Sequence, residues 1–311
     1  MRISQYSRFF PACRWLVILI IFFFISRAVY HGWSGIQGFS LTCRPLILAA
    51  SIAVYCCYLF FSAALWHLLT LFNRVAISFH KGITAWFYSM LARYIPGKIF
   101  SWAGRVYYYN NEGECIKKIT FCFLMEFALQ LLASCLIIIL TLSAIPLGQF
   151  ENFRAGAGIL IIFLLVIIHP KVLQLLLNTF LVWSGREKIE MALNYRIIFL
   201  TLCLYLVNGL VSGYSFYLLV NAFYPVRAEN YFFLTASFLL AAWLGILSFF
   251  APAGLGVRDG VLLVALNLLM PDAISAITVL IARIWTTICE LICVALIFLF
   301  NYLFDPSRKT E

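Results

Sequence analysis

Charged residues are scarce in this chain. They make up 11% of its 311 residues, while hydrophobic residues reach 64% against roughly 45 to 50% in soluble proteins. The longest polar stretches are loops of roughly 10 to 25 residues, far below the usual domain minimum of about 50. These absences exclude a soluble domain, and we interpret residues 1–311 as a single integral membrane domain.

Several kinds of chemical site are also missing. The chain has no Walker A sequence, and the spacing of Gly254, Gly256 and Gly260 does not fit a dinucleotide fingerprint. No Cys/His spacing suits zinc, and the four histidines are scattered. Most of the ten cysteines lie inside apolar runs, which predicts buried thiols rather than a disulfide framework. We therefore predict no metal, no cofactor and no nucleic-acid partner.

Long apolar runs predict an all-α, polytopic membrane helix bundle. A helix needs about 20 apolar residues to cross the hydrocarbon layer. The fourth apolar run is short and is cut by His169-Pro170-Lys171, after which we expect an interfacial helix over 172–183. Seven spans are predicted, at 12–31, 46–71, 119–144, 156–168, 197–220, 231–250 and 273–303.

Two further apolar stretches, 83–104 and 251–271, are interrupted by Pro, Gly and cations. They are candidates for re-entrant segments, which a bilayer tolerates only where protein or a water-filled cavity covers the backbone. Broken helices in the two halves of a membrane protein point to a transport site and are compatible with an inverted repeat. We expect the two segments to converge. The predicted helix-breaking residues are Pro96, Gly97, Pro252, Gly254 and Gly256.

Lys and Arg in the connecting loops predict the orientation. They crowd the second and fourth connections, for example at Lys117 and Arg186, whereas the connections at 146–155 and 221–230 hold one Arg each. Cationic loops therefore fall on the amino-terminal side, which we predict to be cytoplasmic. We interpret the first apolar run as an uncleaved anchor because Arg27 follows it directly.

Charged residues inside apolar runs are functional candidates by default, because burying a charge in the bilayer is expensive. Arg283 and Glu290 are seven residues apart, hence on one helical face. They fit either a structural ion-pair network or a functional site. Glu126 begins a polar stripe with Gln130 and Ser134; this stripe fits a cavity and interhelical hydrogen bonding equally well.

Two smaller patterns concern helix packing and anion binding. The GxxxG spacing of Gly209 and Gly213 favours close helix packing.

Around Arg258, glycines free backbone N–H groups at the start of a helix, and the guanidinium adds a full charge. Together these features suit a phosphate. The alternative is a simple loop with snorkelling cations.

Three sequence elements resemble the lysylphosphatidylglycerol synthase transmembrane-region family. They are Arg93-Tyr94-Ile95-Pro96-Gly97-Lys98 with Arg105, then Pro252-Ala253-Gly254-Leu255-Gly256-Val257-Arg258-Asp259-Gly260, and then Arg283. The resemblance covers roughly 12–303, with Asp259 where the family more often has Glu and Ala253 where a second Gly is common. It implies a stand-alone, flippase-like membrane domain that moves a lipid or assists the synthesis of a modified or glycan-linked lipid.

The leading hypothesis is a lipid translocator of the bacterial cytoplasmic membrane, acting on an anionic or phosphate-bearing lipid, such as a lipid-linked saccharide of envelope biosynthesis. The alternatives are an intramembrane glycosyl or acyl transferase with Asp259 or Glu290 as base, and a membrane subunit that recruits a cytoplasmic transferase. Expected partners are anionic lipids, a transferase and further copies of the chain. The predicted substrate-binding residues are Lys98, Arg105, Glu126, Arg258, Asp259, Arg283 and Glu290.

Overall fold

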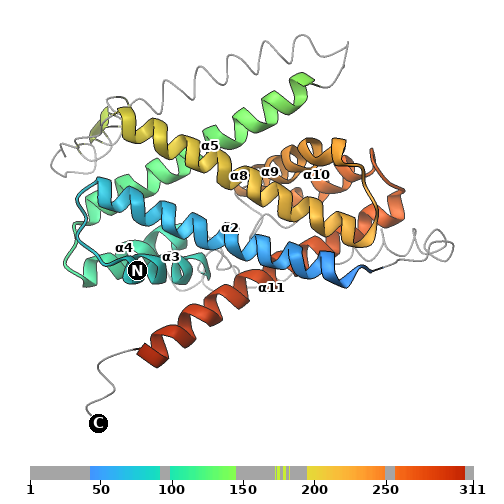
Figure 1. The fold of residues 1–311 in the computed structure, drawn as a ribbon. Helices are drawn as coiled ribbons and strands as arrows, with labels where there is room; N and C mark the ends of the chain where they lie inside the picture. Colours follow the sequence, from blue (N-terminus) through green and yellow to red (C-terminus); the bar gives the residue numbers. More distant parts are fainter. Residues whose placement is uncertain are drawn as a thin grey trace, which may run out of the picture.

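The computed structural model describes residues 43–91, 99–144, 195–248 and 256–304, and the isolated positions 172, 174, 175, 178, 179 and 182. Within these residues the chain forms eight α-helices, one 3-10 helix (Ala228–Asn230) and no β-strand. The predicted all-α fold is confirmed for this part of the chain (Figure 1).

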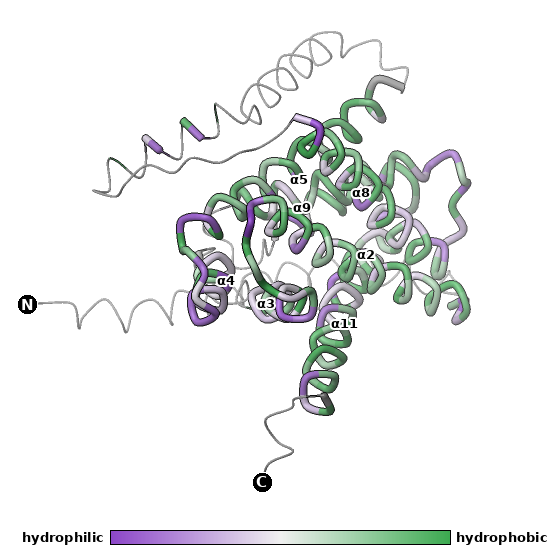
Figure 2. The backbone as a smooth tube through the Cα atoms, turned by 60° about the vertical axis from the view of Figure 1, so that its left-hand side comes forward, coloured by the Kyte–Doolittle hydropathy of each residue, from purple (hydrophilic) through white to green (hydrophobic). Residues whose placement is uncertain are grey.

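Five of the eight helices are long and apolar enough to cross a membrane, as their colouring in Figure 2 shows. Their positions match five of the seven predicted spans. The predicted spans 12–31 and 156–168 lie outside the described residues, as does most of 172–183. The five helices are α2 (Pro45–Phe72), α5 (Ile116–Ala144), α8 (Tyr195–Phe223), α9 (Tyr231–Leu247) and α11 (Asp272–Phe304).

The two interrupted stretches contain short helices. In the first, α3 (Phe79–Leu91) and α4 (Ile99–Asn111) pack against each other. In the second, α10 (Val257–Leu266) packs against α9. Residues 92–98 and 249–255 lie outside the described residues, so the expected convergence of the two stretches stays a prediction.

Interhelical contacts fix the directions of the helices. α2 and α8 are antiparallel, because the Arg44 N–H at the start of α2 donates to the Ala222 carbonyl at the end of α8 at 2.9 Å. The Thr141 hydroxyl, near the end of α5, contacts the Phe232 carbonyl at the start of α9 at 3.5 Å. The ends of α5 and α8 and the starts of α2 and α9 therefore share one end of the bundle.

The other end of the bundle joins the end of α2 to the start of α5, where the Ala76 N–H donates to Glu114 at 2.6 Å. The start of α8 lies here too, since α8 is antiparallel to α2. We call this the basic end, and it lies to the left in Figure 1. Its described cations are Arg74, Lys81, Lys117, Lys118 and Arg196.

Helix α11 runs in the same direction as α2. Trp285 in its first half packs on Tyr55 with ring centroids 4.5 Å apart. Phe300 near its carboxyl end lies 5.0 Å from the His80 ring of α3, beside the basic-end residue Lys81. The carboxyl end of α11 therefore lies at the basic end, a placement that the loop charges alone did not give.

Glycine lets α8 approach its neighbours closely. A Cβ atom built on Gly213 would lie 2.2 Å from the Thr235 Oγ1 atom of α9, and one built on Gly209 would lie 2.9 Å from the Ile137 Cδ1 atom of α5. The packing interpretation of the GxxxG spacing is thus confirmed. Nearby, Asn208 of α8 donates to the Ser62 hydroxyl of α2 at 2.7 Å, so a buried polar side chain also joins two long helices.

We expect Gly213→Ala to destabilise the fold by about 1 to 3 kcal/mol, the usual range for overpacking. The new methyl group would meet the β-branched Thr235, whose rotamer is restricted in a helix. The matched control is Gly260→Ala in α10, where an added Cβ meets nothing within 4 Å. This control should be neutral or stabilising by about 0.5 to 1 kcal/mol. Thermal unfolding of both variants in detergent tests the pair, and equal unfolding temperatures would contradict the close contact.

Candidate functional site

The first group of predicted site residues is a buried ion pair between α4 and α5. Arg105 and Glu126 are only 7% and 5% exposed, and the Arg105 Nη1 atom donates to Glu126 Oε2. The Arg105 Nε–H donates to the Ser89 hydroxyl of α3 at 2.9 Å. The Trp86 indole N–H, also on α3, donates to Glu126 Oε1 at 3.0 Å. Both carboxylate oxygens of Glu126 therefore have protein donors.

Aromatic rings cover the guanidinium of this pair. Its Cζ atom lies 4.2 Å from the centroid of the Trp66 ring, 5.2 Å from Phe123 and 5.7 Å from Trp86. Such cation–π contacts strengthen when water is excluded. The resulting cluster ties α2, α3, α4 and α5 together, which favours the interhelical reading of the stripe that begins at Glu126.

The second group joins α9, α10 and α11. The Asp259 Oδ1 atom of α10 lies 3.6 Å from the Arg283 Nη1 atom of α11. The Arg258 guanidinium, which is half-buried, lies 5.1 Å above the Phe238 ring of α9. These three charged residues form what we call the α10 cluster. It carries two cations and one anion within a short stretch of structure.

The α10 cluster lies at mid-depth in the bundle. Phe238, which Arg258 contacts, stands at the middle of the candidate span Ala228–Leu247. Trp285, two residues beyond Arg283, packs on Tyr55, which is itself well inside α2. Charged side chains at this depth are costly in a membrane and are therefore functional candidates.

Local sequence explains why α10 begins here. Gly256 adopts φ of 83°, in the left-handed half of backbone space that glycine enters without steric cost. Its N–H donates to the Asp259 Oδ2 atom at 3.1 Å, and α10 starts at the next residue. The carboxylate thus satisfies a backbone donor in the first helical turn, where a negative charge is also favoured by the helix dipole.

Five of the seven predicted substrate-binding residues fall into these two groups. Glu290 lies on α11, two turns beyond Arg283, and is buried at 3% exposure. The carboxylate found beside Arg283 is that of Asp259, a partner that one-face spacing could not indicate. Lys98 and four of the five predicted helix-breaking residues, Pro96, Gly97, Pro252 and Gly254, lie outside the described residues.

The sequence did not predict the aromatic contacts of the Arg105 and Arg258 guanidinium groups. Trp66, Trp86 and Phe238 lie in apolar stretches of a chain that is 17% aromatic, so nothing in the sequence distinguishes them from lipid-facing or core residues. The only signal is indirect: a cation in an apolar helix needs cover, and aromatic faces provide it.

The described helices and their buried charges define a multi-pass α-helical membrane protein. Comparison of the sequence with protein-family models and with curated proteins gives no match.

Proposed function

We propose that this protein is a flippase-like translocator of an anionic or phosphate-bearing lipid in the bacterial cytoplasmic membrane. One observation carries the proposal: at mid-depth, where the short helix α10 starts, Arg258 lies over Phe238 and its neighbour Asp259 lies 3.6 Å from Arg283 of α11. Transport sites are typically built in this way, near the midplane and at the ends of discontinuous helices. The resemblance to the lysylphosphatidylglycerol synthase transmembrane-region family supports the same reading.

Phosphate recognition follows from the chemistry of Arg258. A guanidinium offers donors in a planar fork that matches phosphate oxygens. Arg258 stacks on Phe238, and among the described residues the carboxylate of the neighbouring Asp259 lies against Arg283 instead. A lipid phosphate that reaches this depth would therefore meet a cation whose charge is balanced mainly by the ligand itself.

With Asp259 as base, the transferase alternative receives less support from the same geometry; Glu290, the other candidate base, is buried on α11. Asp259 is already engaged by Arg283 on one oxygen and by the Gly256 N–H on the other. A general base needs a carboxylate within hydrogen-bond reach of the substrate proton, and these contacts assign Asp259 a charge-balancing and helix-capping part instead. The recruitment alternative would use the basic end, as a docking surface for a cytoplasmic transferase.

Leaflet-resolved lipid transfer tests the proposal. Purified protein is reconstituted into vesicles that contain a fluorescent anionic lipid, and the outer leaflet is bleached chemically. A translocator lets the inner-leaflet dye reach the bleach, so the fluorescence falls below the plateau seen in protein-free vesicles. The same plateau with and without protein would contradict translocation and favour recruitment or a transferase.

The proposed orientation places the basic end in the cytoplasm, together with the amino terminus and the carboxyl end of α11. Labelling of introduced cysteines should find positions near Lys117 and Arg186 cytoplasmic and positions near Gln149 and Glu229 external. Two native thiols form a matched pair, because Cys115 and Cys43 are both exposed and lie at opposite ends of the bundle. A single-cysteine protein that retains Cys43 should react from outside and one that retains Cys115 from inside; the reverse would overturn the orientation.

A further inference from the structure

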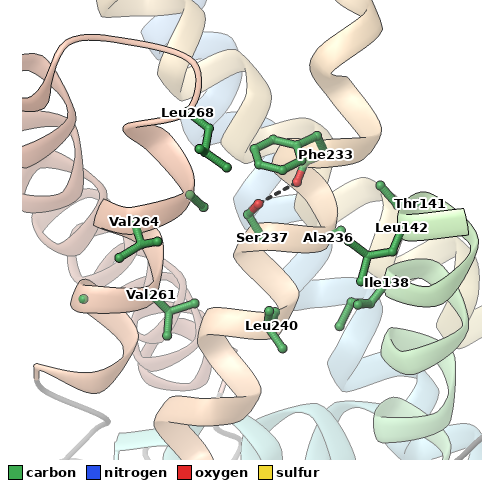
Figure 3. Close-up of a pocket in the computed structure, with 12 residues that line it drawn as sticks. Ile138, Thr141, Leu142, Phe233, Ala236, Ser237, Leu240, Val261, Val264 and Leu268 are labelled. Atoms are coloured by element: carbon green, nitrogen blue, oxygen red, sulfur yellow. Dashed lines mark hydrogen bonds between the residues drawn. The ribbon is translucent and has the colours of Figure 1, made fainter. Parts of the chain in front are cut away.

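A partly open apolar pocket of about 400 Å³, which we call the cavity, lies between α5, α9 and α10 (Figure 3). Its size is within the range of about 300 to 1,000 Å³ that is usual for ligand sites. Side chains from all three helices point into it. The lining residues that matter here are Val261, Val264 and Ala265 of α10 and Leu268, two residues beyond its end; they face Ser237 and Leu240 of α9.

The wall of the cavity is chemically suited to a hydrocarbon. Its two hydroxyl groups are committed to backbone carbonyls of their own helices: Ser237 donates to Phe233 at 2.8 Å, drawn as a dashed line in Figure 3, and Thr141 donates to Ile137 at 2.8 Å. The remaining lining residues are aliphatic, apart from Phe233 and Gly260. A polar ligand would lose its hydration here without compensation, whereas a hydrocarbon chain would not.

The cavity and Arg258 lie along one face of α10. Val261 and Ala265 follow Arg258 at intervals of three and seven residues, which puts all three on the same side of the helix, and Leu268 lies two residues beyond the end of α10. Arg258 marks the mid-depth end of this face. Thr141, which also lines the cavity, lies at the end of the bundle opposite the basic end. From mid-depth toward the end opposite the basic end, this face therefore presents a cation followed by an apolar cavity.

We propose that the cavity holds an acyl chain of the transported lipid while Arg258 binds its phosphate. This inference rests on the proposed function and narrows its substrate class to lipids whose phosphate is joined through a short linker to a hydrocarbon chain. In this arrangement the acyl chain points from mid-depth away from the basic end. A lipid from the leaflet at the basic end would have this orientation once its head group had moved to the middle of the membrane.

Photolabelling with a defined lipid tests the cavity directly. The full chain is reconstituted in phosphatidylcholine vesicles that contain phosphatidylglycerol with a diazirine in one acyl chain, and adducts are mapped after illumination. We expect adducts to concentrate on α9 and α10 residues of the cavity wall, including Val261 and Ala265. Diacylglycerol with the same diazirine chain should label the cavity less, and Arg258→Ala should remove the difference between the two probes.

Two filling variants and one control sharpen the test. Ala265→Trp, or the smaller change Val261→Phe if the first variant does not fold, should lower cavity labelling about tenfold, the effect of losing the burial of roughly two methylene groups. Ala295→Trp places the same bulky side chain at an exposed position of α11 and should leave labelling within about twofold. Equal labelling in the filled variants would overturn the proposal.

Other occupants give other patterns. Two results would overturn the acyl-chain site. In one, wild-type adducts spread evenly over the exposed face of α11. In the other, the lipid never labels the cavity, because another segment or a second copy of the chain fills it. Cavity labelling without leaflet transfer would contradict the proposed function and leave the site standing. Lipid transfer at the normal rate in a folded Ala265→Trp variant would contradict the acyl-chain site and leave the proposed function standing.

Discussion

Arg258→Ala should abolish lipid translocation while the protein stays folded and at its normal level in the membrane. The side chain is half-buried and contacts the Phe238 ring, so within the described part of the chain its removal leaves no buried carboxylate without a partner. A hydrogen bond between a charged donor and a phosphate contributes about 1.5 to 3 kcal/mol, and in a bidentate arrangement two are lost together. The leaflet-transfer assay in vesicles measures the effect.

Two further variants separate binding from structure. Arg258→Lys should restore transport only in part, because a lysine keeps the charge but loses the planar fork. Arg227→Ala removes an exposed loop cation and serves as the control, with transport expected to be unchanged. Full activity in Arg258→Ala would sink the phosphate-binding role and favour the recruitment alternative.

The contact between Asp259 and Arg283 predicts a different response. Exchanging the two charges, by Asp259→Arg with Arg283→Asp, keeps their attraction but moves a cation into the first turn of α10 and removes the acceptor for the Gly256 N–H. We expect this exchange to restore folding relative to either single variant without restoring transport. Recovery of transport in the exchanged protein would assign the pair a purely structural part.

The largest stability effect is expected at Arg105. Arg105→Met should destabilise the protein by about 3 to 5 kcal/mol, because it leaves Glu126 buried without its countercharge. Lys81→Met is the matched control: Lys81 pairs with Glu112 at 2.6 Å, but its side chain is 48% exposed. An exposed pair of this kind contributes only about 0 to 1 kcal/mol. Denaturation in detergent micelles compares the two variants.

Replacing both partners distinguishes an uncompensated charge from lost packing. In Arg105→Met with Glu126→Leu no charge remains, so most of the stability should return. A residual loss of about 1 to 3 kcal/mol is expected because the Trp86 indole loses its acceptor. If the double variant is as unstable as Arg105→Met alone, the aromatic contacts of the guanidinium, rather than the charge pair, stabilise this part of the bundle.

Hydropathy and glycine spacing predicted much of the described fold. Apolar runs located α2, α5, α8, α9 and α11 to within a few residues at most of their ends, since bilayer thickness imposes a length on such helices. Glycine spacing located the close contact of α8 with its neighbours. These features depend on residues close in sequence, or on a single physical constraint that acts on every span alike.

The sequence did not predict which intramembrane cation pairs with which carboxylate. Arg105 and Glu126 lie on different helices, as do Asp259 and Arg283, and which carboxylate meets which cation depends on how those helices pack. One-face spacing singled out Arg283 and Glu290, but it describes a single helix and cannot indicate a partner on the next one. Charge in an apolar run therefore identified candidate residues without identifying their contacts.

The length of α11 has a mechanical consequence. Its 33 residues extend about 50 Å, well beyond a hydrocarbon layer of about 30 Å, so the helix must tilt or run into the headgroup layer. Figure 2 shows α11 reaching the lower edge of the helices, and in its last turns Phe298, Phe300 and Tyr302 are exposed, although Phe300 still contacts His80 of α3. Because α11 is continuous, a change of tilt imposed at the headgroup layer would move Arg283 relative to Asp259 unless the helix pivots at that point. We therefore expect lipid packing around the basic end to influence the spacing of the charges at mid-depth.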